Sequence, residues 1–205
     1  MTKTDQVPGT RRKGSQTRAD IQEAALSLFT ERGYDATSMR EIAEQLGITK
    51  AALYYHFDSK EAVIRSLFTD HLRALDDLLD WAAGQPRSPE LASELLGRWL
   101  TLSGQRGLKT MRFAAANHTA LKSVVPPGQG SALERIDQAT RIILGPDAPL
   151  QDQLRVRMAL LSAHNTVLAA QGTKATNADI LTASIRAATL LVSDLVPAPE
   201  IPITE

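Results

Sequence analysis

Cysteine is absent from this chain of 205 residues, so disulfide bonds, thiolate metal sites and cysteine nucleophiles are excluded. Glycine and proline are scarce, at 12 and 10 residues, and the hydrophobic fraction of 43% is close to that of ordinary globular proteins, which argues against disorder. No apolar run reaches the length of a membrane span, and the stretch from Met1 to Gly14 is polar and basic without a hydrophobic signal core. We therefore expect a soluble, cytoplasmic protein with no membrane partner.

A net charge is also lacking, because 23 lysine and arginine residues balance 23 aspartate and glutamate residues. The distribution is uneven, however, since only Asp5 opposes the cations that precede Ala19. These cations are Lys3, Arg11, Arg12, Lys13 and Arg18. A basic arm of this kind suits a nucleic-acid backbone, but solvated tails of the same composition are common, and charge alone leaves both interpretations open.

Helical periodicity runs along the whole chain and no segment alternates like a strand, so we predict an all-α fold of about nine helices. Capping residues, glycines and prolines set the expected ends of these helices. The predicted helices cover residues 17–33, 37–47, 49–56, 58–83, 88–104, 108–122, 131–145, 151–170 and 177–196. The first is expected to begin at Thr17, with Asp20 completing its cap.

The segment from Thr37 to Glu61 has the spacing of a helix-turn-helix, in which two short helices cross steeply at a tight turn. Ala43 supplies the small residue where the helices cross, and Gly47 tolerates the positive φ that the turn requires. The inward face is completed by Ile42, Leu46, Ile48 and Leu53. The second helix then presents its remaining side chains to a major groove.

The outward side chains of that second helix are hydroxyls, one cation and a small group, namely Thr49, Lys50, Ala51, Tyr54 and Tyr55. Hydroxyl and ammonium groups are good phosphate partners, and small side chains allow close approach to base edges. Two short helices of an ordinary helical protein would show the same spacing, so this outward chemistry and the basic arm are what favour DNA binding.

The run LGITKAALYYHFDSKE, from Leu46 to Glu61, together with Ile42 and Ala43, resembles the TetR family of bacterial transcriptional regulators. The resemblance covers about Thr17 to Leu67, and beyond it only the architecture is similar. It implies a three-helix DNA-binding domain over residues 17–62, after a flexible basic arm at 1–16. A helical regulatory and dimerisation domain would follow at 63–197, with a frayed tail at 198–205.

The resemblance also implies roles for individual residues of the DNA-binding domain. Thr37 is expected to cap the second helix and touch a phosphate, and Tyr54 to reach a base edge or to pack against the first helix. Expected contacts to bases or the adjacent backbone come from Thr49, Lys50 and Ala51, contacts to phosphates from Tyr55, His56 and Lys60, and supporting contacts from Arg18 and Arg40. A structural role for His56 and a solvated surface position for Arg40 stay open.

The last two predicted helices carry few charges on any side. Arg157 is the only charge from Val156 to Ala170 apart from His164, and Arg186 is the only one from Ile180 to Val192. A helix that buries a single face shows charges on the other, so a second subunit is expected here, with a buried hairpin of one monomer as the alternative. TetR-like proteins dimerise through two such helices, which implies an interface of Leu154, Met158, Leu161, Leu168, Leu181, Ile185, Ala188 and Leu191.

A regulatory pocket is expected in the middle of the chain, lined by apolar groups and a few polar ones. Candidate lining residues are Trp81, Trp99, Met111, Phe113, Asn117, His118, Met158, His164 and Asn165. Most of these residue types are more often core than pocket. The scattered histidines lack metal-site spacing, so no metal and no cofactor are expected.

Together these patterns and the resemblance to the TetR family imply a homodimeric repressor that binds a palindromic operator in double-stranded DNA and is released by a small, largely apolar effector. A regulator that answers to a protein partner, or that activates, stays open. So does a helical enzyme or binding protein with an incidental helix-turn-helix. No nucleophile–base pair, phosphate loop or paired catalytic carboxylates stands out, so we expect no enzyme.

Overall fold

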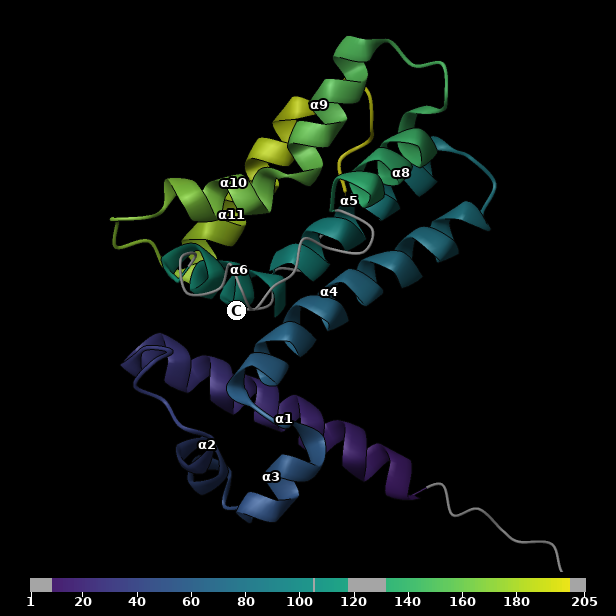
Figure 1. Ribbon diagram of the computed structural model, residues 1–205. Helices are drawn as coiled ribbons and strands as arrows, with labels where there is room; N and C mark the ends of the chain where they lie inside the picture. Colours follow the sequence, from purple (N-terminus) through teal and green to yellow (C-terminus); the bar gives the residue numbers. More distant parts are fainter. Residues whose placement is uncertain (1–8, 105, 118–131, 200–205) are drawn as a thin grey trace, which may run out of the picture. The chain divides into compact units, whose positions relative to one another are not determined.

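The computed structural model describes residues 9–104, 106–117 and 132–199, and within these ranges it contains ten α-helices and no strand (Figure 1). The helices are α1 (Gly9–Arg32), α2 (Met39–Leu46), α3 (Lys50–His56), α4 (Lys60–Ala83), α5 (Pro89–Gly104), α6 (Arg106–Ala116), α8 (Ala132–Leu144), α9 (Leu150–Leu160), α10 (Ser162–Ala169) and α11 (Asn177–Leu191). The predicted all-α fold is confirmed.

Helix α1 begins at Gly9, well before the predicted start at Thr17. The cap expected from Thr17 and Asp20 is therefore wrong, and Asp20 instead accepts a hydrogen bond of 2.8 Å from the side chain of Gln16. The added turns include Arg11, Arg12 and Lys13, which are good helix formers, and also two glycines, which are poor ones. Residues 9–16 of the expected flexible arm are thus helical, and residues 1–8 lie outside the described ranges.

The predicted helix over residues 151–170 is interrupted at Leu161, which separates α9 from α10. The buried indole nitrogen Nε1 of Trp99 donates a hydrogen bond of 3.0 Å to the carbonyl oxygen of Leu160. In a continuous helix this carbonyl would accept a hydrogen bond only from a backbone N–H of the same helix. Here it also accepts one from a residue far away in the sequence, at the point where the helix is interrupted. This interruption accounts for the tenth helix.

Two other predicted helix ends differ from the structure. Helix α11 ends at Leu191, because the chain turns at Val192, whose N–H bonds to the carbonyl of Thr189. Helix α6 ends at Ala116, whereas the prediction ran to Lys122. Residues 118–131, which include the end of the helix predicted over 108–122 and the first residue of the one predicted over 131–145, lie outside the described residues.

The chain divides into two compact units, Met1–Leu67 and Phe68–Glu205, and the boundary falls within α4. The first unit has a core of fully buried side chains from α1 to α4: Ile21, Ala25, Leu28, Phe29, Ile42, Leu53, Val63 and Ile64. In the second unit, one cluster joins α4, α5, α8, α9 and α11, and includes Leu79, Leu95, Leu96, Trp99, Leu100, Ile136, Ala159 and Ala188. Among the described residues, no helix combines the length and the apolar character needed to cross a membrane.

Candidate nucleic-acid interface

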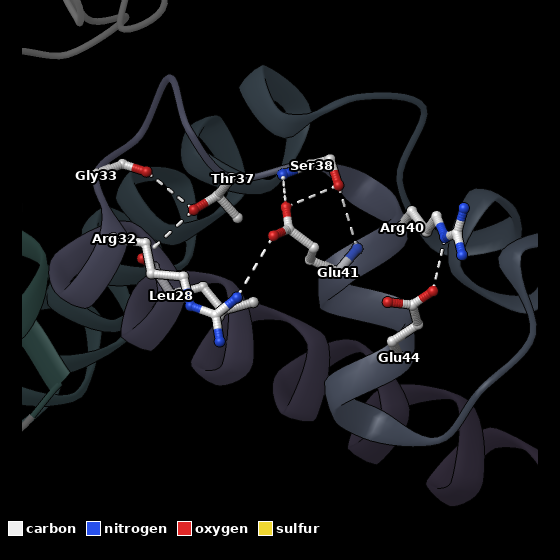
Figure 2. Close-up of polar contacts among 8 residues, drawn as sticks. All are labelled: Leu28, Arg32, Gly33, Thr37, Ser38, Arg40, Glu41 and Glu44. Atoms are coloured by element: carbon white, nitrogen blue, oxygen red, sulfur yellow. Dashed lines mark hydrogen bonds and ion pairs between the residues drawn. The ribbon is translucent and has the colours of Figure 1, made fainter.

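The start of α2 is held by a capping box (Figure 2). The Ser38 side chain accepts a hydrogen bond from the backbone N–H of Glu41, and the Glu41 carboxylate accepts one of 2.8 Å from the backbone N–H of Ser38. The hydrogen bonds from the backbone and the hydroxyl of Ser38 lower the pKa of Glu41. Arg32, at the end of α1, adds an ion pair to Glu41 at 3.4 Å. The cap therefore fixes the first turn of α2 and ties it to α1.

Thr37 does not cap α2, so that prediction is wrong, and its side chain is turned inward. Only 1% of the residue is exposed. Its hydroxyl lies 2.9 Å from the carbonyl oxygen of Gly33 and 3.4 Å from that of Leu28 (Figure 2). The Thr37 hydroxyl is thus used to hold the turn between α1 and α2, and it is not available to a phosphate. Ser38, one position further, has the role that Thr37 was expected to have.

The turn between α2 and α3 has the geometry that the sequence predicts. Gly47 adopts φ 63° and ψ 27°, a left-handed conformation that residues with a Cβ rarely take. The backbone N–H of Ile48 then bonds to the carbonyl of Ala43 at 3.0 Å. Thr49 caps α3 by accepting a hydrogen bond of 3.1 Å from the backbone N–H of Ala52. These bonds fix the angle at which α3 leaves the turn.

Helix α3 presents the predicted set of side chains to solvent. Thr49, Lys50 and Ala51 are exposed at its start, while Leu53 on the opposite side is fully buried. Tyr55 is 86% exposed and Tyr54 is 44% exposed, so both rings stand outside the core. A flat, exposed face of hydroxyl groups, a cation and a small residue suits contact with a polar surface.

His56 and Arg18 support the end of α3. The His56 ring is partly buried and packs edge-on against the Tyr55 ring, with centroids 5.2 Å apart. The Arg18 guanidinium lies over the Phe57 ring at 4.3 Å from its centroid, and its Nη1 is 3.5 Å from the His56 carbonyl oxygen. A cation at the carboxyl end of a helix is favoured by the helix dipole. Arg18 therefore positions α3 within the unit, which was not the role predicted for it.

Lys60 has partners within the first unit. Its Nζ donates a hydrogen bond of 2.8 Å to the carbonyl oxygen of Tyr34 and lies 4.5 Å from the centroid of the Tyr34 ring. The Tyr34 hydroxyl in turn donates to the Glu61 carboxylate at 2.6 Å. This bond is the largest cause of the lowered pKa of Glu61, and burial is the largest cause of the raised pKa of Tyr34. We call Tyr34, Lys60 and Glu61 the tyrosine lock.

The tyrosine lock joins the α1–α2 turn to the first turn of α4. Sequence reasoning missed Tyr34 and Glu61 because 27 positions separate them and no helical spacing connects them. Arg40 on α2 differs from Lys60, since its side chain is exposed and its ion pair with Glu44, at 2.6 Å, is a local one. An exposed pair of this kind is weak, so Arg40 can exchange Glu44 for a phosphate at little cost.

The predicted pocket residues of the second unit do not gather around one cavity. Trp99 and Phe113 are buried, Met111 packs on a small apolar cluster, and the Asn117 side chain bonds to the carbonyl of Phe113. Three further candidates lie exposed on the described chain, namely Met158, His164 and Asn165. His118 lies outside the described residues, and only Trp81 of the predicted set lines the cavity between α4 and α5. The described members of the set lie in such different surroundings because side-chain type alone does not give the direction of each helix face.

Helix α11 packs against both α9 and α10 (Figure 1), and these three helices carry large apolar side chains that are exposed to solvent. The most exposed members are Leu150, Leu154, Met158, Leu168 and Leu190. Of the residues predicted for pairing, Leu161, Leu181, Ile185 and Leu191 are half-buried. Ala188 is fully buried in the core of its own unit and cannot contribute to this face. We call the exposed set the α9–α11 apolar face.

These features define an all-helical protein with an N-terminal helix-turn-helix whose second helix faces outward. Residues 21–67 match the family described as bacterial regulatory proteins of the tetR family. This match spans the helix-turn-helix, and over these residues the chain resembles the TetR family.

Two curated relatives align with the N-terminal part. The chain is 51% identical over 43 residues to IcaR of Staphylococcus aureus strain Newman, the negative transcriptional regulator of the biofilm operon icaADBC, covering 21% of this chain and 23% of that protein. It is 35% identical over 79 residues to the transcriptional repressor KstR2 of Mycolicibacterium smegmatis, covering 38% of this chain and 35% of that protein. The chain thus aligns with about a quarter to a third of the length of these relatives.

A solved structure extends the likeness of the fold to most of the chain. The TetR-family transcriptional regulator from Marinobacter aquaeolei VT8 superposes with a TM-score of 0.61 at 22% identity, covering 89% of this chain and 93% of that one. At this identity the likeness concerns the fold.

Proposed function

We propose that the protein is a transcriptional repressor that binds double-stranded DNA through α3. The observation that carries this proposal is the exposed face of α3, from Thr49 to Tyr55, set on a buried framework of caps and apolar contacts. A rigid helix with exposed hydroxyl groups and a cation is what major-groove recognition requires. The named relatives, a negative regulator and a repressor, support the same direction of control.

Selection of bound sequences from a random DNA pool tests this function. We expect an enriched site that the Lys50→Ala, Tyr55→Ala double variant no longer retains, because both side chains are exposed and neither supports the core. Lys174→Ala is the matched control, since it removes an exposed cation from the second unit. An unchanged pattern of enrichment with the double variant, or no enrichment with the native chain, would contradict the proposal.

The proposed repressor is a dimer that pairs through the α9–α11 apolar face. Leu154 and Met158 are each about half exposed, at 51% and 52%, and lie one helical turn apart. Apolar side chains in such a row are stabilised by a second apolar surface. A two-fold dimer would present two copies of α3 to a palindromic site, with half-sites about one duplex turn apart.

The oligomeric state is tested by sedimentation. Leu154→Glu with Met158→Glu places two charges in the proposed interface and should give monomers. Leu133→Glu is the matched control, because Leu133 is an exposed leucine on α8, outside the α9–α11 apolar face. A double variant that still sediments as a dimer would place the interface elsewhere.

We further propose that a small ligand bound in the second unit releases the DNA. Helix α4 runs from Lys60 of the tyrosine lock to Trp81 at the cavity wall, so a displacement of this helix by a ligand can reach the tyrosine lock. Such control requires the ligand to bind the two states with different affinity.

A further inference from the structure

The second unit contains a cavity of about 910 Å³ between α4, α5 and the segment after α11. Leu78 and Trp81 of α4 form one wall, and Leu102 belongs to the α5 wall. Ser93 donates a hydrogen bond of 3.3 Å to the carbonyl oxygen of Ala198, so the C-terminal segment closes the third side. This volume lies within the range of small-molecule sites in proteins, about 300–1,000 Å³.

The Trp81 ring already receives a cation within this cavity. The guanidinium carbon of Arg98 lies 4.0 Å from the ring centroid. Arg98 also forms an ion pair of 2.6 Å with Glu94, one turn earlier on α5, and half of its side chain is exposed. The face of an indole ring attracts cations because of its negative electrostatic potential. A half-exposed arginine held by a local pair can move aside and leave the ring to a ligand.

The charged groups of the cavity wall are mainly carboxylates. Asp77, Glu90 and Glu94 oppose the single guanidinium of Arg98. Glu94 is paired with Arg98, whereas Asp77 and Glu90 form no ion pair within the described part of the chain. The backbone N–H at its own position and the Ser88 hydroxyl lower the pKa of Glu90, so Glu90 is ionised at neutral pH. The wall therefore carries an excess of negative charge beside an aromatic face.

We propose that this cavity binds an organic cation with an apolar aromatic body. The apolar body lies against Trp81 and Leu78, in place of the Arg98 guanidinium, and the positive charge is placed near Asp77 and Glu90. Charge complementarity decides this choice, because the carboxylates of the wall outnumber its one guanidinium and attract a cation, whereas a neutral ligand gains nothing from them. The proposed effect on DNA rests on the proposed function, whereas binding of the cation does not depend on it.

A pair of probes of equal shape and opposite charge tests the ligand class. Titration calorimetry of the full chain with tetraphenylphosphonium is expected to show binding at one site per chain, and tetraphenylborate is expected to bind at least about tenfold more weakly, as attraction to two exposed carboxylates implies. Equal or tighter binding of the anion would overturn the proposal.

Variants then locate the site. The isosteric pair Asp77→Asn and Glu90→Gln should weaken binding of tetraphenylphosphonium by about tenfold, and Trp81→Leu by about fivefold from loss of the aromatic face. Asp147→Asn is the matched control, since Asp147 is exposed and lies outside the cavity. Cation binding that none of the cavity variants weakens, or that Asp147→Asn weakens as much, would overturn the assignment of the site.

A separate DNA arm distinguishes failure of the site from failure of the proposed function. With a DNA site selected as above, tetraphenylphosphonium should release the native chain and not the Asp77→Asn, Glu90→Gln variant. Binding of the cation without release would refute its role as effector. If no DNA site is found, the proposed function fails, and the calorimetric comparison still decides whether the cavity binds cations.

Discussion

The tyrosine lock makes a quantitative prediction about the first unit. Tyr34→Phe removes only the hydroxyl that donates to Glu61 at 2.6 Å, because the Lys60 ammonium can still lie over a phenyl ring and bond to the backbone carbonyl. Hydrogen bonds to charged groups contribute about 1.5–3 kcal/mol. Glu61 is partly exposed, so water replaces part of this bond and we expect a loss of about 1–1.5 kcal/mol in the free energy of unfolding.

The pH dependence of this loss identifies its cause. The Tyr34 hydroxyl lowers the pKa of Glu61 in the folded state, so its stabilisation is fully present above the unfolded value of about 4.3. It is lost as the pH falls through the lowered pKa of the folded state. The difference between the native chain and Tyr34→Phe should therefore shrink as the pH is lowered from 7 to 3.

Urea denaturation at several pH values measures this difference. Tyr54→Phe is the matched control, since Tyr54 is exposed and its hydroxyl forms no hydrogen bond with the described residues. We expect the control to unfold as the native chain does at every pH. A loss of stability in Tyr34→Phe that stays constant down to pH 3, or no loss at pH 7, would refute this account of the lock.

Three further predictions concern other parts of the fold. Ser38→Ala removes the cap of α2 and should cost about 1 kcal/mol of stability, measured by thermal unfolding, with no change expected if the capping box is unimportant. Trp99→Phe leaves the Leu160 carbonyl without its indole donor and reduces core volume, which should cost about 2–4 kcal/mol in chemical denaturation; a loss below about 1 kcal/mol would argue against the bond. Burial and, secondarily, Arg135 lower the pKa of His71, so stability should fall as the pH drops below about 6.5, by at most about 1.4 kcal/mol per pH unit. His71→Asn should make that part of the profile flatter, and an unchanged profile would exclude His71 as its source.

The helix-turn-helix could be predicted closely from the sequence because its determinants are local. A serine three residues before a glutamate and a glycine at a left-handed position act within one or two turns of chain. The structure therefore agrees with the predicted ends of α2 and α3 to within two residues. The same local reasoning placed the cap of α2 at Thr37, and only the fold shows that the Thr37 hydroxyl is turned inward and that Ser38 is the cap.

Features that depend on contacts between distant segments could not be predicted in this way. The interruption at Leu161 coincides with a hydrogen bond from Trp99, and the position of Lys60 depends on Tyr34. For the cavity, residue type pointed to aromatic and polar side chains of the middle helices, but their directions send Trp99 into the core and His164 into solvent. Helical spacing identifies faces, and it does not say which face meets which neighbour.

Most of the cations around α3 already have partners within the protein, and this affects how DNA binding should depend on ionic strength. Arg18 and Lys60 already have partners within the unit, and Arg40 pairs with Glu44, whereas Lys50 forms no ion pair with another described residue. Each DNA phosphate that a protein cation neutralises changes the slope of log affinity against log salt concentration by about 0.9, because salt ions are released from the DNA. A cation that must first leave a partner within the protein gives a smaller net release of salt ions than a cation without such a partner. We therefore expect DNA binding by these described residues to tolerate added salt better than the number of basic residues near α3 suggests.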